Sequence, residues 1–181
     1  NLQGPVDDAF MDAFVFVRPT GTPINPAVGA WAKSEMERAV TQWRQQYRGD
    51  APILDDTAVT AEDIRTKNLI LWGDPSSNKV IANLAPKLPI QWSAADVKVK
   101  DKAHPSANHA PILIYPNPQN PAKYIVLNSG FTFREYDYLN NARQTPKLPD
   151  WTIIDVTTAP NSRTPGKIVD ANFFDEKWQV K

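Results

Sequence analysis

The chain has 181 residues, of which 41% are hydrophobic and 22% are charged, and this composition is typical of a folded domain rather than of a disordered segment. Its 20 Lys and Arg residues equal its 20 Asp and Glu residues, so no net field attracts nucleic acid, and we expect no nucleic-acid partner. The chain contains no cysteine, which excludes disulfide bonds, thiolate nucleophiles and cysteine-based zinc sites.

No apolar run approaches the roughly 20 residues that cross a bilayer, and we therefore expect no membrane span. The first residues also lack the basic start and the apolar stretch of a signal peptide. We expect a single domain over residues 1–181, and the abrupt start at Asn1 suggests a domain excised from a larger protein.

The first half of the chain alternates expected strands with expected helices. Residues 13–17 and 68–72 are continuous apolar runs, typical of strands buried on both faces. Between them, residues 30–47 carry apolar side chains at helical spacing, which predicts an amphipathic helix ended by Gly49. Glu35 belongs to the charged residues that this pattern assigns to the exposed surface.

Shorter elements fill the gaps between these three. Residues 53–54 form an extended piece, and Thr60 with Asp63 has the spacing of a capping box, which predicts a short helix. The polar segment 73–78 turns the chain into another helix, over residues 80–84.

The second half has a different pattern, in which the strands expected between residues 97 and 128 are antiparallel and complete one edge of the sheet. Residues 134–143 are expected to be helical and residues 173–178 to form a short terminal element. Strands are expected at residues 97–100, 112–115, 124–127 and 151–156. Together the elements predict an α/β fold with three layers, Rossmann-like or flavodoxin-like, in which helices cover both faces of a mixed, mainly parallel sheet.

Polar side chains follow the expected strands at their carboxyl ends, where ligands of open α/β sheets collect. Ser76 or Ser77 lies near the start of a helix, and this position favours either an anion site or simple helix capping, of which capping is the more common. The candidate ligand-binding residues of these loops are Arg18, Thr20, Asp74, Ser76, Ser77, Asn78, Asn128 and Ser129.

A catalytic serine is a weaker hypothesis. The chain has no Gly-x-Ser-x-Gly elbow, which nucleophilic serines of α/β hydrolases require. An independent hydrolase would have to pair Ser129 or Ser76 with His104 or His109 as the base. The two histidines are five residues apart in a loop, which is not a metal-binding spacing on a helix, so we expect neither a metal nor a cofactor.

Six tryptophans raise the possibility of a surface that stacks on sugars. Trp43, Trp72 and Trp151 lie in apolar elements and are expected in the core. An exposed aromatic platform for carbohydrate would then consist of Trp31, Trp92 and Trp178.

Several strings resemble a C-terminal region of bacterial secreted hydrolases related to the prolyl oligopeptidase and α/β-hydrolase esterase group. The strings lie at residues 2–11, 68–78, 124–135, 146–151 and 173–178. The resemblance implies a secreted or periplasmic protein in which the catalytic triad lies in another segment, and it assigns no catalytic residue to this chain.

We therefore expect a non-catalytic accessory domain of a secreted serine hydrolase, a peptidase or an esterase. It would pack on the catalytic domain of the same polypeptide or help it to form homo-oligomers. The first alternative is a module that binds carbohydrate or another ligand through exposed aromatic side chains, and the second is the small independent hydrolase.

Overall fold

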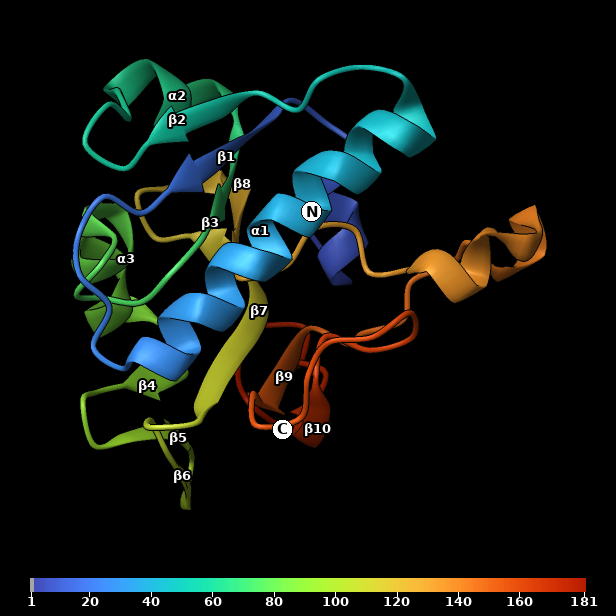
Figure 1. Cartoon of the computed structure of the whole chain (residues 1–181). Helices are drawn as coiled ribbons and strands as arrows, with labels where there is room; N and C mark the ends of the chain where they lie inside the picture. The colour runs from blue at the N-terminus through green and yellow to red at the C-terminus, as the bar shows by residue number, and fades with distance from the viewer. Residues whose placement is uncertain (1) are drawn as a thin grey trace.

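The computed structural model describes residues 2–181 and is built on one seven-stranded sheet with the order β10-β9-β7-β8-β3-β1-β2 (Figure 1). Its strands are β1 (Phe14–Arg18), β2 (Ile53–Asp55), β3 (Asn68–Leu71), β7 (His109–Asn117), β8 (Asn120–Leu127), β9 (Trp151–Asp155) and β10 (Lys167–Asn172). Strands β2, β1, β3 and β8 pair in parallel, and β7, β9 and β10 join them through antiparallel pairs.

The prediction of a three-layer α/β fold with a mainly parallel sheet is wrong. The large sheet has as many antiparallel as parallel neighbour pairs, and only one of the three α-helices in residues 2–181 is longer than six residues. The antiparallel hairpin of β7 and β8, which meets at the tight turn where Asn117 pairs with Asn120, was expected from the sequence. It was expected at one edge, however, whereas it lies in the middle of the sheet, and β9 and β10 add two further antiparallel pairs. The fold is a mixed, mostly β architecture.

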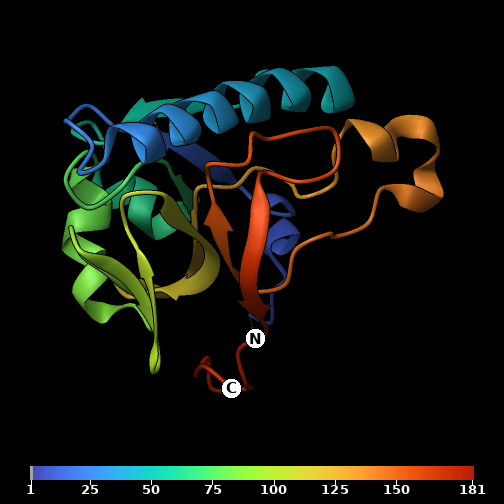
Figure 2. The same cartoon turned by 60° about the horizontal axis from the view of Figure 1, so that its bottom comes forward.

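One long helix covers one side of the large sheet, as Figure 2 shows: α1 (Pro26–Tyr47). Phe16 and Trp72 point toward α1, whereas Val15 and Val17 point to the opposite core, as the alternation of side chains along a strand requires. The helix begins at Pro26, where the missing N–H costs nothing. It ends at Arg48 in a left-handed conformation with φ 57°, one residue before the expected glycine.

Small elements cover the opposite side of the sheet. They are α2 (Ala61–Thr66), α3 (Lys79–Leu84) and a second sheet of β4 (Gln91–Trp92), β5 (Asp96–Val99) and β6 (Lys102–Pro105). Ile64, Ile81 and Val97 from these elements pack into the core on this side. The capping box of α2 is confirmed, because the Thr60 hydroxyl accepts from the Asp63 N–H and the Asp63 carboxylate accepts from the Thr60 N–H.

A projecting arm replaces the helix expected at residues 134–143. It consists of two 3₁₀-helices, η3 (Glu135–Leu139) and η4 (Asn141–Arg143), and it extends away from the body in both views (Figures 1 and 2). A further 3₁₀-helix, η1 (Val6–Phe10), lies near the start of the chain, and η2 (Ala85–Lys87) follows α3. The short element expected at residues 173–178 is only a single bridge between Phe174 and Val180.

Within residues 2–181, no helix combines the length and apolar character that a bilayer crossing needs.

The capping box predicts a pH dependence of stability. Hydrogen bonds from Lys67 and Thr60 lower the pKa of Asp63 from 3.8 to about 2. Because the folded state lowers this pKa, the carboxylate stabilises the fold above pH 3.8, and the stabilisation is lost as the pH falls toward about 2. Urea unfolding across this range is expected to show a smaller pH dependence for Asp63→Asn than for the wild type. Equal pH dependence would contradict the assignment.

Candidate functional site

The loops at the carboxyl ends of β1, β3 and β8 interlock through hydrogen bonds. The Asn128 side chain accepts from the Gly73 N–H at 2.8 Å and donates to the Gly73 carbonyl at 2.9 Å. The Gly21 N–H donates to the Ser77 carbonyl at 2.8 Å. The loops that carry most of the candidate ligand-binding residues are therefore hydrogen-bonded to one another.

Most polar side chains of these loops are buried and satisfied by the backbone. The Asp74 carboxylate accepts from the backbone N–H groups of Ile24, Ser76 and Ser77 at 2.8–2.9 Å. The Asn78 carboxamide oxygen caps α3; the N-cap is thus Asn78 and not Ser76 or Ser77. These side chains hold the loops in place, and little of their hydrogen-bonding capacity is left for a ligand.

Three of the candidate residues remain accessible: Arg18, Thr20 and Ser76. The Arg18 guanidinium forms an exposed ion pair with Asp55 at 2.7 Å. Among the three, only Arg18 lines a sizeable cavity.

That cavity, which we call the α1–β2 groove, has a volume of about 750 Å³. Its apolar lining includes Met36, Val40, Ile53 and Trp72. Charged residues of both signs line it too: Arg18, Lys33 and Glu37. The groove lies beside the carboxyl ends of β1 and β3, and from these strands the chain leaves toward opposite faces of the sheet. Such a switch point is a common location for binding in open sheets.

The serine–histidine pair that the alternative of an independent hydrolase requires is not formed. The Ser129 hydroxyl is buried and donates to the Gly130 carbonyl at 2.8 Å. The His109 ring contacts the Pro105 carbonyl at 2.9 Å and lies 5.4 Å from the His104 ring. Across residues 2–181, no hydrogen bond connects a histidine with a serine.

The surroundings of His104 favour its neutral form. Burial lowers the pKa of His104, and nearby His109 lowers it further, while the Asp170 carboxylate, 3.9 Å away, acts in the opposite direction. No group of three or more potential metal ligands gathers in the part of the chain that the structure describes.

The three tryptophans of the expected aromatic platform lie on separate elements. Trp31 is 5% exposed in α1, and its indole N–H donates to the Pro165 carbonyl at 2.6 Å. Trp92 and Trp178 are half-buried, and the Trp178 ring packs against Tyr115 and Phe174. Since Trp31 belongs to the core, the three do not form one exposed surface.

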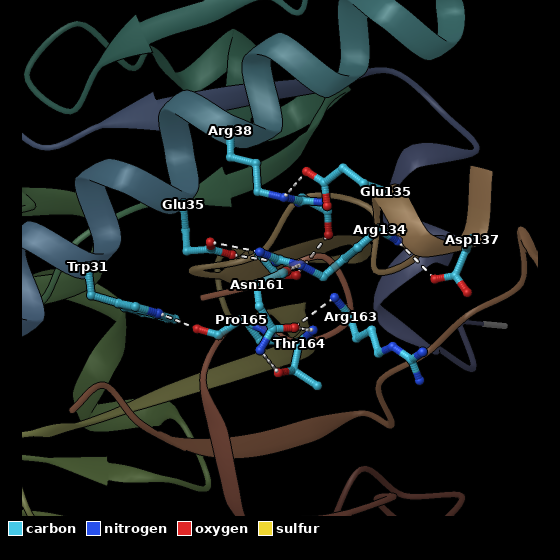
Figure 3. Close-up of polar contacts among 12 residues, drawn as sticks. Trp31, Glu35, Arg38, Arg134, Glu135, Asp137, Asn161, Arg163, Thr164 and Pro165 are labelled. Carbon is cyan, nitrogen blue, oxygen red and sulfur yellow. Dashed lines mark hydrogen bonds and ion pairs between the residues drawn. The ribbon is translucent and has the colours of Figure 1, made fainter. Parts of the chain in front are cut away.

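A buried ion pair connects α1 to the segment after β8, and the sequence pattern missed it. In Figure 3, Arg134 and Glu35 point toward each other, and both side chains are at most 6% exposed. The guanidinium donates to the two carboxylate oxygens at 2.7 and 3.1 Å and to the Asn161 carbonyl at 2.8 Å. The expectation that Glu35 lies on the surface is wrong, because its helical position faces a cation that comes from far along the chain.

A second ion pair lies beside the buried one. Arg38, one turn after Glu35, donates to both carboxylate oxygens of Glu135 at 2.9 and 3.1 Å (Figure 3). At the base of the arm, the Arg134 N–H donates to Asp137 at 3.0 Å. The whole cluster is internally paired and therefore joins segments together instead of offering a free charged site.

Comparisons with known proteins give no further lead: no family model, no curated protein and no solved structure matches this chain.

The buried ion pair predicts an asymmetric mutational response. Arg134→Met leaves the Glu35 carboxylate buried without its cation and is expected to lower the free energy of unfolding by about 3–5 kcal/mol. The double variant Glu35→Leu with Arg134→Met removes both charges and is expected to recover most of that loss, measured by urea denaturation. The matched control is Arg65→Ala, which breaks an exposed pair with Glu62 and should change stability little. If the loss of stability in the double variant equalled the sum of the losses in Arg134→Met and Glu35→Leu alone, the two charges would not be coupled.

Proposed function

We propose that this chain is a non-catalytic accessory domain that packs on the catalytic domain of a secreted or periplasmic serine hydrolase. The α1–β2 groove is the observation that carries this proposal. Its lining combines the buried side chains of Met36 and Trp72 with Ile53, which is 37% exposed. A partly apolar groove of this size is suited to burial against another folded domain.

The strand beside the groove supports the same proposal. Strand β2 has only three residues and forms one edge of the large sheet. Edge strands offer unpaired backbone groups, and native proteins commonly cover or shorten them. A domain placed over the groove would bury both Ile53 and the free side of β2.

The nature of the partner comes from the sequence resemblance. The strings at residues 68–78 and 124–135 resemble the C-terminal region of secreted hydrolases. The first ends in the loops beside the groove, and the second passes from β8 through Arg134. We therefore propose a serine peptidase or esterase domain of the same polypeptide as the partner, with the catalytic triad in that domain.

A second candidate function is the binding of a small molecule in the same groove. Its volume of about 750 Å³ lies within the range of small-molecule sites. A ligand would then replace the partner domain over Met36, Val40 and Trp72.

The chain alone is expected not to hydrolyse p-nitrophenyl acetate or peptidase substrates above the buffer rate. The reason is that the Ser129 hydroxyl donates to the backbone and has no histidine as a general base. The measurement compares wild type with Ser129→Ala in the same assay. Turnover that disappears in Ser129→Ala would overturn the accessory proposal and identify an independent hydrolase.

Binding to the hydrolase domain is expected to depend on the groove. The complete reading frame should encode a domain with a Gly-x-Ser-x-Gly elbow, and this domain, produced separately, should bind the chain in isothermal titration calorimetry. Ile53→Asp is expected to weaken binding at least about tenfold, because it introduces a charge into a desolvated contact.

The matched control for Ile53→Asp is Ile168→Asp, since Ile168 is similarly exposed at 41% but lies in β10 at the other edge of the sheet. Equal effects of the two variants would contradict the assignment to the α1–β2 groove. A reading frame without a hydrolase domain would contradict the partner.

A further inference from the structure

A second groove lies between η1, the end of α1 and the base of the arm, and we call it the η1–arm groove. Its volume is about 310 Å³, and none of its lining residues lines the α1–β2 groove. Its walls are mainly apolar and include Phe10, Met11, Tyr47, Phe131, Phe133 and Pro146. It is therefore a separate surface of the molecule.

Exposed aromatic and sulfur-containing side chains form the rim of the η1–arm groove. Met11 is 83% exposed and Tyr47 is 51% exposed. The Tyr47 ring packs edge-on against Phe131 with centroids 5.7 Å apart, and Phe131 lies 4.4 Å from Phe133. Phe131 and Phe133 are buried, and their packing holds the Tyr47 ring in place while leaving it half-exposed to a ligand.

Two carboxylates also line this aromatic groove. Asp7 accepts from the Thr132 N–H at 2.8 Å and from the Thr132 hydroxyl at 2.5 Å, and Asp8 accepts from the Tyr124 hydroxyl at 2.5 Å. Within residues 2–181, no Lys, Arg or His side chain forms an ion pair with either carboxylate. Burial raises the pKa of Asp7, because its charge is poorly solvated there.

The combination of an exposed aromatic ring with carboxylates that are hydrogen-bonded but have no cationic partner is complementary to a cation. A guanidinium group stacks on aromatic faces and also donates paired hydrogen bonds to carboxylates, whereas the ammonium of lysine does not stack as a plane. The surrounding Met11 and Pro146 suit the apolar residues that flank such a side chain in a loop.

We propose that the η1–arm groove binds an arginine side chain presented by a loop of the partner domain. This inference rests on the proposed docking function and specifies the chemistry of a second contact. The arginine would lie against Tyr47 with its guanidinium directed toward Asp7 and Asp8, and its neighbours in the loop would cover Met11.

A peptide probe tests the groove without the partner domain. Acetyl-Leu-Arg-Leu-amide is titrated into the isotopically labelled chain and compared with the citrulline peptide, which has the same shape but no charge. The arginine peptide is expected to shift the backbone amide signals of Met11, Tyr47 and Gln144, and to bind about tenfold more tightly than the citrulline peptide.

A pair of matched variants localises the effect. Tyr47→Ala is expected to reduce binding of the arginine peptide about tenfold, since it removes one aromatic face. Phe173→Ala is the control, because Phe173 is 52% exposed but does not line the groove, and it should bind like the wild type. Equal affinity for the two peptides, or shifts confined to other surfaces, would overturn the inference.

The same variants separate this inference from the proposed function. If Ile53→Asp weakens binding of the hydrolase domain but Tyr47→Ala does not, the docking function stands and the arginine contact is wrong. If the chain alone forms a dimer in sedimentation experiments and Tyr47→Ala disperses it, the groove binds a second copy of the chain, which also overturns the arginine contact.

Discussion

The buried pair of Arg134 and Glu35 is the contact that most constrains how distant segments of this structure lie relative to one another. A guanidinium and a carboxylate removed from water are tolerable only when they meet with good geometry, because either one alone would cost several kcal/mol. This requirement fixes the rotation and the axial position of α1 relative to the segment that follows β8. It also fixes the loop at residues 161–165, since Asn161 accepts from Arg134 and Pro165 accepts from Trp31. Three segments distant in sequence are thereby held in one arrangement (Figure 3).

Both grooves are consequences of the position that this pair gives to α1. One side of the helix, through Met36 and Val40, forms a wall of the α1–β2 groove, and the far end of the helix contributes Tyr47 to the η1–arm groove. The arm, in turn, leaves the body directly after Arg134. A single internal contact therefore determines where the two proposed contact surfaces lie relative to each other.

The sequence allowed the local elements to be predicted better than their assembly. Continuous apolar runs identified β1 and β3, and the spacing of Thr60 and Asp63 identified the start of α2. The strand-end loops were expected to offer polar side chains to a ligand, but most of these side chains are satisfied by the backbone, so that the proposed binding depends on apolar walls. Glu35 and Arg134 are 99 residues apart, and no local pattern reveals such a pair. The same limitation explains the wrong fold class, because no local pattern shows that β9 pairs with β7 and so places the expected hairpin in the middle of the sheet.

The interlocked loops at the carboxyl ends of the strands also constrain how this domain can evolve. In many open sheets these loops vary freely and acquire new chemistry while the strands stay unchanged. Here the carboxamide of Asn128 is bonded to the backbone of Gly73, and the carboxylate of Asp74 is bonded to three backbone groups. A substitution that introduced a nucleophile or a base at these positions would remove hydrogen bonds that hold the loops in place. Diversification is therefore easier along α1 and the arm, where exposed side chains can be exchanged without loss of internal hydrogen bonds.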